Sequence, residues 1–243
     1  MTGLETTILC EGYAGLVAQG LGLAEAAGLA TAPHALAPRI PWRWMPARLW
    51  PAPLAAVGLT APFPGLVIAV GGVGAAVGAA LRSRGSRVVQ VQHPRMPLAR
   101  FDLVIAGRHD RISGPNVVLT RTALHRATPA RLAEAATHWA PRLAHLPRPL
   151  VAVLVGGTNG RFRLDREVGA RLGAALAAMM RADRVGLALT PSRRTSPASV
   201  AALRAALEPA GAYIWDGTGE NPYFGLLGLA DAIIVTIDSV SMI

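Results

Sequence analysis

The sequence predicts an α/β protein with two Rossmann-like domains, each built on a parallel sheet. Its 243 residues exceed the usual size of a single domain. Continuous apolar runs such as residues 150–155 are typical of strands buried on both faces, and they alternate with segments of helical period. Because 52% of the residues are hydrophobic and only 16% charged, a sizeable core is expected and disorder is excluded.

In the first half, a strand is predicted at residues 6–10, followed by a helix that ends near residue 27. Further strands are predicted at 66–70, 87–91, 103–106 and 116–119. The uncharged run 65–81 is nearly long enough for a membrane span, but the glycines at 71, 72 and 74 interrupt it. A strand, a glycine turn and a buried helix explain this run better, so no transmembrane segment is expected.

Residues 31–64 are rich in Pro and Trp and show no clean period. Trp42, Trp44 and Trp50 either form a binding surface or fasten a long loop to the core, and the second interpretation is favoured. A helix opens at Thr128 and ends near Trp139, and a proline-rich linker follows at 141–149. The predicted domains are therefore 1–145 and 146–243.

In the second half, strands are predicted at 150–155, 185–189, 212–215 and 232–236. The first helix between them carries apolar residues from Leu164 to Met179 at helical spacing. Ser196 with Pro197, and Asn221 with Pro222, mark the starts of two more helices. The chain stops at residue 243, about one turn into a further helix, so a second domain truncated at its C-terminus is expected.

The loops that follow these strands are rich in glycine, hydroxyl and arginine residues. In a parallel sheet they gather at the carboxyl edge, where ligands bind, and the fourth strand is expected beside the first. Glycines let backbone amides approach an anion, helix N-termini add partial positive charge, and adjacent arginines can clamp a phosphate. The predicted nucleotide or sugar-phosphate site comprises Gly156, Gly157, Thr158, Asn159, Gly160, Ser192, Arg193, Arg194, Asp216, Glu220, Asn221, Asp238, Ser239 and Ser241.

A plainer interpretation of each residue stands beside this one. The glycines also suit simple turns, Asn221 and Ser239 also suit helix caps, and Arg193 with Arg194 also suits a solvated loop. Asp216 and Glu220 would pair with hydroxyl groups rather than with phosphate.

Two histidines at predicted strand ends of the first domain are candidates for general base catalysis. His93 and His109 are expected to face an interdomain cleft, and Asp110 could orient an imidazole. Structural histidines that bond the loop backbone are the favoured alternative.

The formal charge of +10 comes from arginines alone, and these are scattered rather than clustered. Nucleic acid is therefore not an expected partner. Cys10 is the only cysteine, which excludes a disulfide and a multi-cysteine metal site, and it is expected to be an inert core thiol. No metal ligand set is predicted. The N-terminus shows no signal peptide, so a cytoplasmic location is expected.

A series of short strings resembles the mitochondrial-fission Elm-type family in its bacterial branch, and their order covers nearly the whole chain. They are residues 41–44 (PWRW), 92–95 (QHPR), 101–104 (FDLV), 109–110 (HD), 114–117 (GPNV), 156–160 (GGTNG), 215–223 (WDGTGENPY) and 238–242 (DSVSM). The resemblance implies a GT-B-like arrangement of the two domains and kinship with nucleotide-sugar glycosyltransferases. The chain ends before the glutamate that would hold the donor ribose in those enzymes.

The resemblance leaves enzymatic activity open. One hypothesis is binding of a nucleoside diphosphate sugar without a further cofactor, with transfer of the sugar to an unknown acceptor. The alternative is a non-catalytic adaptor that uses a GT-B shell to recruit a protein or membrane-associated partner. Epimerase chemistry is less favoured, because its usual tyrosine–lysine pair requires a lysine and the chain has none.

Overall fold

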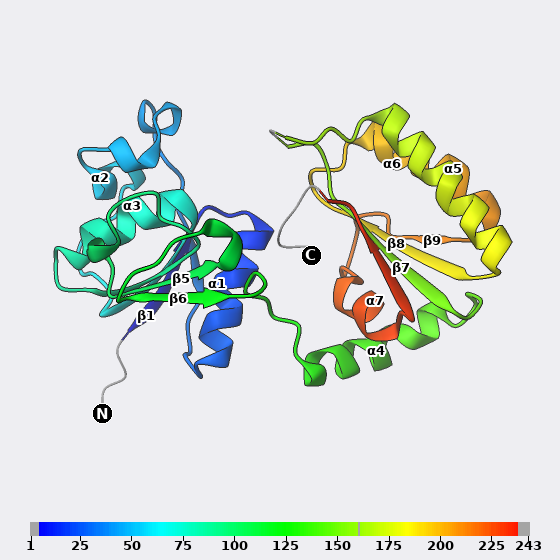
Figure 1. Cartoon of the computed structure of the whole chain (residues 1–243), viewed down its shortest axis with the longest axis horizontal. Coiled ribbons are helices and arrows are strands. Elements are labelled where there is room, and N and C mark those ends of the chain that lie inside the picture. The colour runs from blue at the N-terminus through cyan, green and yellow to red at the C-terminus, as the bar shows by residue number, and fades with distance from the viewer. Residues whose placement is uncertain (1–4, 160, 238–243) are drawn as a thin grey trace. The chain divides into compact units, whose positions relative to one another are not determined.

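The computed structural model describes residues 5–159 and 161–237 (Figure 1). The chain divides into two compact units, Met1–Arg126 and Ala127–Ile243, each of which is an α/β structure. This division lies before the boundary expected near residue 145. The helix expected to close the first domain, α4 (Pro129–Leu143), packs against α7 (Tyr223–Leu229) of the second unit instead.

The first unit contains a parallel sheet with the strand order β2-β1-β3-β4-β5-β6. Its strands are β1 (Thr6–Cys10), β2 (Pro33–Ala35), β3 (Leu66–Val70), β4 (Arg87–Val91), β5 (Leu103–Gly107) and β6 (Val117–Thr120). Its helices are α1 (Ala14–Ala26), α2 (Pro53–Val57) and α3 (Gly71–Arg82), with short 3-10 turns η1 (Trp42–Trp44), η2 (Ala47–Leu49), η3 (Leu98–Arg100) and η4 (Arg108–Asp110). The predicted strands are confirmed, and β2 is an additional edge strand. The expected glycine turn is not a separate element, because α3 begins at Gly71 directly after β3.

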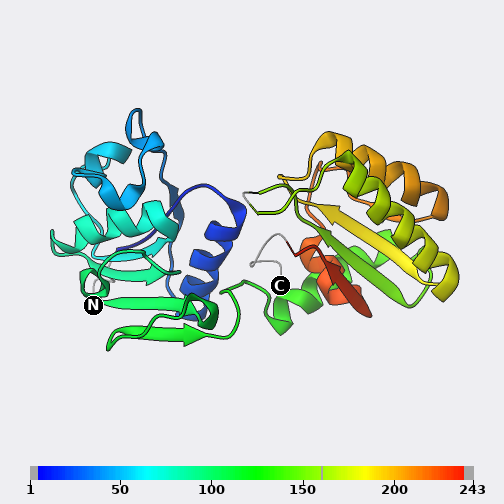
Figure 2. The ribbon, with the colours of Figure 1, turned by 45° about the horizontal axis from the view of Figure 1, so that its top comes forward.

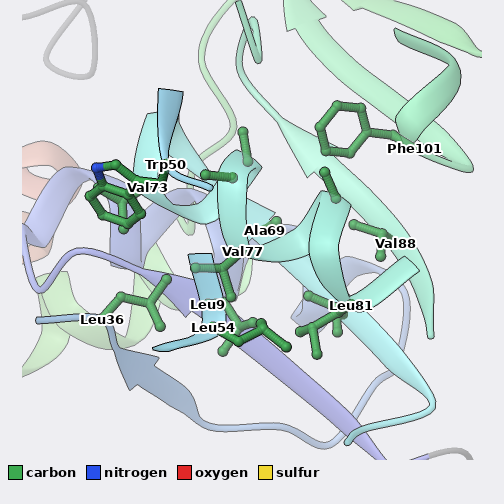
Figure 3. Close-up of a cluster of buried hydrophobic side chains, with 14 of the residues drawn as sticks. Leu9, Leu36, Trp50, Leu54, Ala69, Val73, Val77, Leu81, Val88 and Phe101 are labelled. Atoms are coloured by element: carbon green, nitrogen blue, oxygen red, sulfur yellow. The ribbon is translucent and has the colours of Figure 1, made fainter. Parts of the chain in front are cut away.

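Apolar side chains pack on both faces of this sheet. On one face, Val77 and Leu81 of α3 gather with Leu9 of β1 and Leu54 of α2 (Figure 3). On the other face, α1 covers a cluster that includes Cys10, which is a buried free thiol. Burial, and then the charge of Glu11, raise the pKa of Cys10, which agrees with the expected inert core thiol.

The second unit has the strand order β10-β7-β8-β9, and all of its pairings are parallel. Its strands are β7 (Leu150–Val155), β8 (Gly186–Pro191), β9 (Tyr213–Ile214) and β10 (Ala232–Val235). Its helices are α4 (Pro129–Leu143), α5 (Arg166–Asp183), α6 (Pro197–Leu207), η5 (Glu208–Ala210) and α7 (Tyr223–Leu229). Helices α5 and α6 cover one face of the sheet and α4 and α7 the other, an arrangement that both views show (Figures 1 and 2).

Two helix limits differ from the sequence expectation. Helix α5 begins at Arg166, because Asp165 caps it by accepting a hydrogen bond from the Val168 amide, so Leu164 lies in the preceding loop. Helix α4 continues through Pro141 to Leu143 rather than ending near Trp139. Near a helix end proline removes few backbone bonds, and the buried Trp139 and Leu143 hold this turn in place.

Asp102 joins neighbouring strands of the first sheet, and its carboxylate should matter for stability. It accepts a hydrogen bond of 2.8 Å from the Val88 amide and lies 3.3 Å from both Arg82 and Arg87. Desolvation works toward a higher pKa, but the Val88 bond and the two arginines outweigh it and lower the pKa of Asp102. The ionised form therefore stabilises the folded state.

We expect Asp102→Asn to lower the free energy of unfolding at pH 7 by about 1–3 kcal/mol. Because the folded-state pKa is lowered, this contribution is present above the unfolded pKa of about 4 and is lost as pH falls through the folded value. Urea unfolding of both proteins at pH 7 and pH 3 measures it, with exposed Glu134→Gln as the control. A difference between the proteins that does not shrink in acid would contradict the assignment.

Candidate functional site

The carboxyl edge of the second sheet brings together the loops after its strands. Strand β10 pairs with β7, with Val235 beside Leu154, and β8 pairs with β7 on its other side. The predicted placement of the fourth strand beside the first is therefore confirmed. In such a sheet the reversal of strand order next to β7 creates the crevice where ligands bind.

Hydrogen bonds hold the loops after β7, β8 and β10 against one another. The Gly156 amide donates to Thr236 Oγ1 at 2.7 Å. The buried Thr195 hydroxyl donates to Val155 O at 3.3 Å and to Gly156 O, and it accepts from the Ser192 amide at 3.0 Å. Two threonine hydroxyls thus fix the position of the glycine loop that follows β7 (residues 156–159).

Gly157 makes the closest approach between the β7 and β8 loops. A Cβ atom built on it would lie 2.1 Å from the carbonyl oxygen of Arg194 and 2.7 Å from the Arg194 Cβ. Only a glycine allows the two backbones to lie this close. This packing holds the arginine pair of the β8 loop directly beside the glycine loop.

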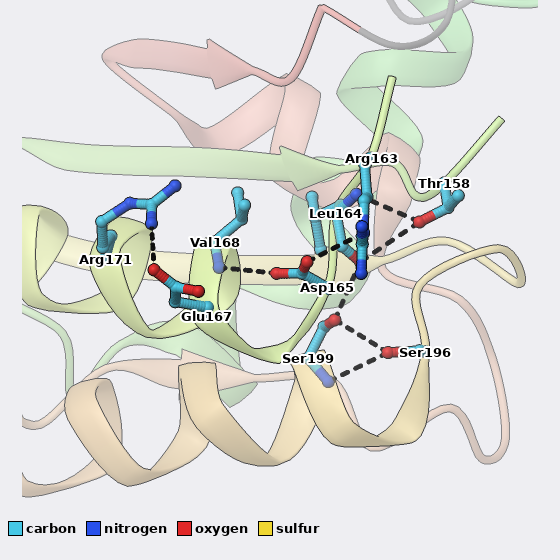
Figure 4. Close-up of polar contacts among 9 residues, drawn as sticks. All are labelled: Thr158, Arg163, Leu164, Asp165, Glu167, Val168, Arg171, Ser196 and Ser199. Carbon is cyan, nitrogen blue, oxygen red and sulfur yellow. Dashed lines mark hydrogen bonds and ion pairs between the residues drawn. The ribbon is translucent and has the colours of Figure 1, made fainter. Parts of the chain in front are cut away.

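The start of α5 is stabilised by the chain itself (Figure 4). The Leu164 amide donates to Thr158 Oγ1 at 3.0 Å, and Ser199 Oγ donates to Leu164 O at 3.0 Å. Asp165 caps α5, and its bond from Val168, together with Arg163, lowers the pKa of its carboxyl group. Ser196 caps α6 by accepting from the Ser199 amide at 3.1 Å.

These caps correct one part of the prediction. The N-termini of α5 and α6 were expected to present amides and partial positive charge to an anion. Their side-chain caps already satisfy part of each terminus, and Asp165 adds a negative charge at α5. A phosphate would therefore depend on side chains and on the glycine loop more than on helix ends.

Other predicted ligand residues are engaged by their own loops. Asn159 Oδ1 accepts from the amides of Arg161 and Phe162, and Asn221 Oδ1 accepts from Tyr223, each at 2.8–2.9 Å. Both are turn contacts. The plainer interpretation had Asn221 as a helix cap, but the N-cap of α7 is Pro222, so the Asn221 bond lies in the turn just before the helix.

The two acidic residues of the β9 loop are also engaged. Asp216 Oδ1 accepts from the amide and hydroxyl of Thr218, and these bonds lower its pKa. Glu220 lies 2.8 Å from His138 Nε2. The carboxylates thus shape the loop, and their predicted pairing with ligand hydroxyls stays a prediction.

Arginines dominate the charge of the two contacting loops. Arg193 and Arg194 are exposed in the β8 loop, and Arg161 and Arg163 are exposed in the β7 loop. The described part of these loops offers one carboxylate, Asp165, which lies 3.0 Å from Arg163. An excess of forked cations beside a glycine loop suits a phosphate group.

The sequence interpretation missed Thr236, Arg161 and Arg163. A threonine directly after a strand, and basic residues just past the glycine string, were the available signals. Four predicted residues, Gly160, Asp238, Ser239 and Ser241, lie outside the described part of the chain.

The candidate base residues lie in the first unit. His93 follows β4, and its Nδ1 accepts a 2.9 Å bond from the Arg95 amide, which is the backbone contact of a structural histidine. His109 in η4 lies 3.8 Å from Asp110 Oδ1, and Asp110 Oδ2 accepts from the Gly107 amide at 3.1 Å. Both histidines thus lie at strand ends, as predicted, and their catalytic role stays a prediction.

Two searches of the described residues bear on other functions. Within residues 5–159 and 161–237, no three His, Cys, Asp or Glu side chains cluster closely enough to share a metal ion. Over the same residues, none of the helices combines the length and apolar character that crossing a membrane requires.

A sequence model of the family described as "Mitochondrial fission ELM1" matches residues 14–243. The "Mitochondrial fission protein ELM1" of Arabidopsis thaliana is 35% identical over 210 residues. This match covers 74% of the chain but 48% of the relative, so the chain spans about half of that protein's length.

Solved structures of similar fold include UDP-GlcNAc 2-epimerases. One from Neisseria meningitidis, bound to UDP-GlcNAc, has a TM-score of 0.56 at 9% identity and covers 97% of this chain and 78% of its own. A putative enzyme of this kind from Listeria monocytogenes has a TM-score of 0.54 at 10% identity, with coverage of 99% and 76%. At such identities the likeness concerns the fold, and it confirms the expected GT-B-like α/β class.

Proposed function

The chain belongs to the mitochondrial fission ELM1 family, and from that premise we propose that the carboxyl edge of its second sheet binds the diphosphate of a nucleotide sugar. A cytoplasmic location, and no need for a further cofactor, are parts of this proposal. The observation that carries it is the contact between the Gly157 backbone and the Arg194 backbone, which joins a glycine loop to an arginine pair.

The chemistry of these loops supports a phosphate-bearing ligand. The Gly156 amide is used by Thr236, so the glycine loop contributes its lack of side chains, and the exposed Thr158 and the half-buried Ser192 lie on the same two loops. Arg193 and Arg194 supply guanidinium groups that match phosphate oxygens in geometry and charge. The structures of similar fold include the N. meningitidis epimerase bound to UDP-GlcNAc and a complex of S. aureus MnaA with UDP, with a TM-score of 0.54, which agrees with a nucleotide-sugar ligand.

Transfer of the sugar to an acceptor is a further step of this proposal. Positive groups beside the diphosphate would stabilise the charge that develops as it leaves. His93 or His109 would accept the acceptor's proton, and Asp110 would orient His109. Because His93 Nδ1 accepts a backbone bond, the neutral ring carries its proton on Nε2, so His93 could accept a further proton only by giving up that bond.

A non-catalytic adaptor is the second candidate. The observation that favours it is that the side chains of Asn159, Asp216 and Asn221 accept bonds within their own loops, which leaves fewer side chains for a sugar ring. Glu220 is likewise engaged, by His138 of α4. In that case the same edge would bind a nucleotide without turnover, or bind none.

Titration calorimetry with UDP, GDP and uridine tests the proposed site. We expect one of the diphosphates to bind and uridine to bind much more weakly, because the phosphates make the main contacts. Arg193→Ala combined with Arg194→Ala should weaken diphosphate binding at least about tenfold, since each charge-assisted bond contributes about 1.5–3 kcal/mol.

The matched control is Arg181→Ala, an exposed arginine in the last turn of α5. It changes the net charge without touching the loops. Equal affinity of the double variant and the wild type would overturn the site, and no binding of any diphosphate would favour the adaptor.

A further inference from the structure

Exposed apolar side chains concentrate in one short segment of the first unit. Between residues 40 and 49, Ile40 is 62% exposed, Trp44 71%, Met45 41% and Leu49 58%. We call these four residues, together with the exposed Arg43 and Arg48, the Trp44 patch. On the surface of a soluble protein, exposed apolar side chains are normally scattered singly. Their concentration in one segment therefore indicates an interaction surface.

The exposure of the Trp44 patch is built into the fold. The buried Trp50 donates its Nε1 proton to Trp42 O at 3.0 Å and to Met45 O at 3.2 Å. Trp42 and Ala47 pack against the core cluster below, and backbone bonds close both 3-10 turns. The segment is therefore anchored at Trp42 and Trp50 and presents Trp44 to solvent.

This arrangement resolves the two interpretations of the tryptophans. The expectation that they fasten a long loop to the core is confirmed for Trp50 and Trp42, which are buried and half-buried. It is wrong for Trp44, because a residue that is 71% exposed does not anchor the loop to the core. Figures 1 and 2 both show this segment on the outer side of α2 and α3, away from the first sheet.

The charge around the patch has one sign. Arg43 and Arg48 alternate with the apolar residues, and the sequence contains no Asp or Glu between Glu25 and Asp102. No carboxylate of the segment can neutralise these arginines. The patch therefore complements a negatively charged surface that also accepts apolar side chains.

We propose that the Trp44 patch docks the protein on an anionic lipid bilayer. Tryptophan and arginine favour the boundary between headgroups and acyl chains, where an indole ring is half wet and a guanidinium meets phosphate. Met45, Leu49 and Ile40 would enter the acyl region, and the two arginines would bind anionic headgroups. This contact is independent of the nucleotide site proposed above.

The same observations disfavour the other occupants. A second copy that used the same patch would bring the arginines of both copies into one interface, with no carboxylate of the segment to pair with them. An acidic peptide would satisfy Arg43 and Arg48 but would leave four exposed apolar side chains without matching partners. A lipid surface satisfies both kinds of side chain at once.

Co-sedimentation of the 243-residue chain with vesicles tests the proposal. The vesicles are phosphatidylcholine alone, or phosphatidylcholine with one third phosphatidylglycerol, at physiological ionic strength. We expect binding to the anionic vesicles. Trp44→Ser should weaken it about tenfold, and Arg43→Gln with Arg48→Gln about 25-fold, since each arginine near such a surface contributes about fivefold.

Two controls separate the patch from the overall positive charge. Arg100→Gln with Arg121→Gln removes the same charge from exposed positions elsewhere in the first unit, and Leu119→Ser removes an exposed apolar side chain of β6. Both should bind vesicles nearly as the wild type does. Circular dichroism should show that every variant is folded, which the exposure of each residue favours.

Three outcomes would overturn the proposal. In the first, anionic vesicles do not retain the wild type. In the second, the patch variants lose no more binding than the controls do. In the third, sedimentation velocity would show a wild-type dimer that Trp44→Ser dissociates while vesicle binding is absent, and the patch would then be a contact between copies.

Discussion

Replacing Trp139 by Ala should lower the free energy of unfolding of the second unit by about 3–5 kcal/mol. Trp139 is 3% exposed on α4, and its ring lies against the backbone of α7. A Cβ atom on Gly225 would be 2.4 Å from the indole, so glycine leaves no side chain that could fill the cavity. The variant would also remove the cation–π contact with Arg142, whose guanidinium carbon lies 4.6 Å from the ring centroid.

Hydrogen exchange measured by mass spectrometry locates this loss. Because α4 belongs to the second unit, faster exchange should appear in α4, α7 and β7, and the first sheet should keep its protection. Glu134→Ala is the control, since it changes an exposed residue of the same helix and should cost less than about 0.5 kcal/mol. If β1 to β5 lost protection instead, α4 would belong to the first unit, which is what a domain boundary near residue 145 predicts.

The strands and most helix starts could be predicted because their signals are local. A continuous apolar run of six residues such as 150–155 is typical of a strand buried on both faces of a sheet. Ser196 followed by Pro197 is a helix-start signal of only two residues. Strand β2 escaped prediction because Pro33–Ala35 is a three-residue exposed edge without an apolar pattern. Its pairing with β1 is a tertiary contact.

The candidate site could be predicted only as a set of neighbouring loops. Parallel topology places the loops after β7, β8 and β10 on one edge, and sequence alternation is enough to predict that topology. It does not predict that Thr195 would bond Gly156, or that Asn159 would be used by its own turn. Such partners depend on how two loops meet, and the same residue types serve as ligands and as loop supports.

The exposure of Trp44 is another feature that the sequence alone could not predict. The sequence places three tryptophans within nine residues, and nothing in their spacing tells which of them faces the core. The structure buries Trp50 and exposes Trp44, because the Trp50 indole bonds two carbonyl groups of the segment. Anchoring and exposure are thus linked, since the buried ring fixes the direction of the exposed one.

Replacing Gly157 by Ala should separate the β7 loop from the β8 loop. The new methyl group would lie 2.1 Å from Arg194 O and 2.2 Å from the Arg194 carbonyl carbon. A backbone obstacle cannot rotate away as a flexible side chain can, so one loop must move, and we expect a loss of about 3 kcal/mol in the free energy of unfolding. The bonds from Thr195 to Val155 and Gly156 should weaken with it.

The matched control is Gly72→Ala, at an exposed position in the first turn of α3 where a Cβ atom would meet nothing within 4 Å. Alanine there should be neutral or stabilising by up to about 1 kcal/mol. Urea unfolding of the two variants measures the stability, and calorimetry with UDP or GDP measures the site. If Gly157→Ala kept full stability but lost nucleotide binding, the glycine would serve the ligand directly. If it lost neither, the loop contact that carries the proposed function would be wrong.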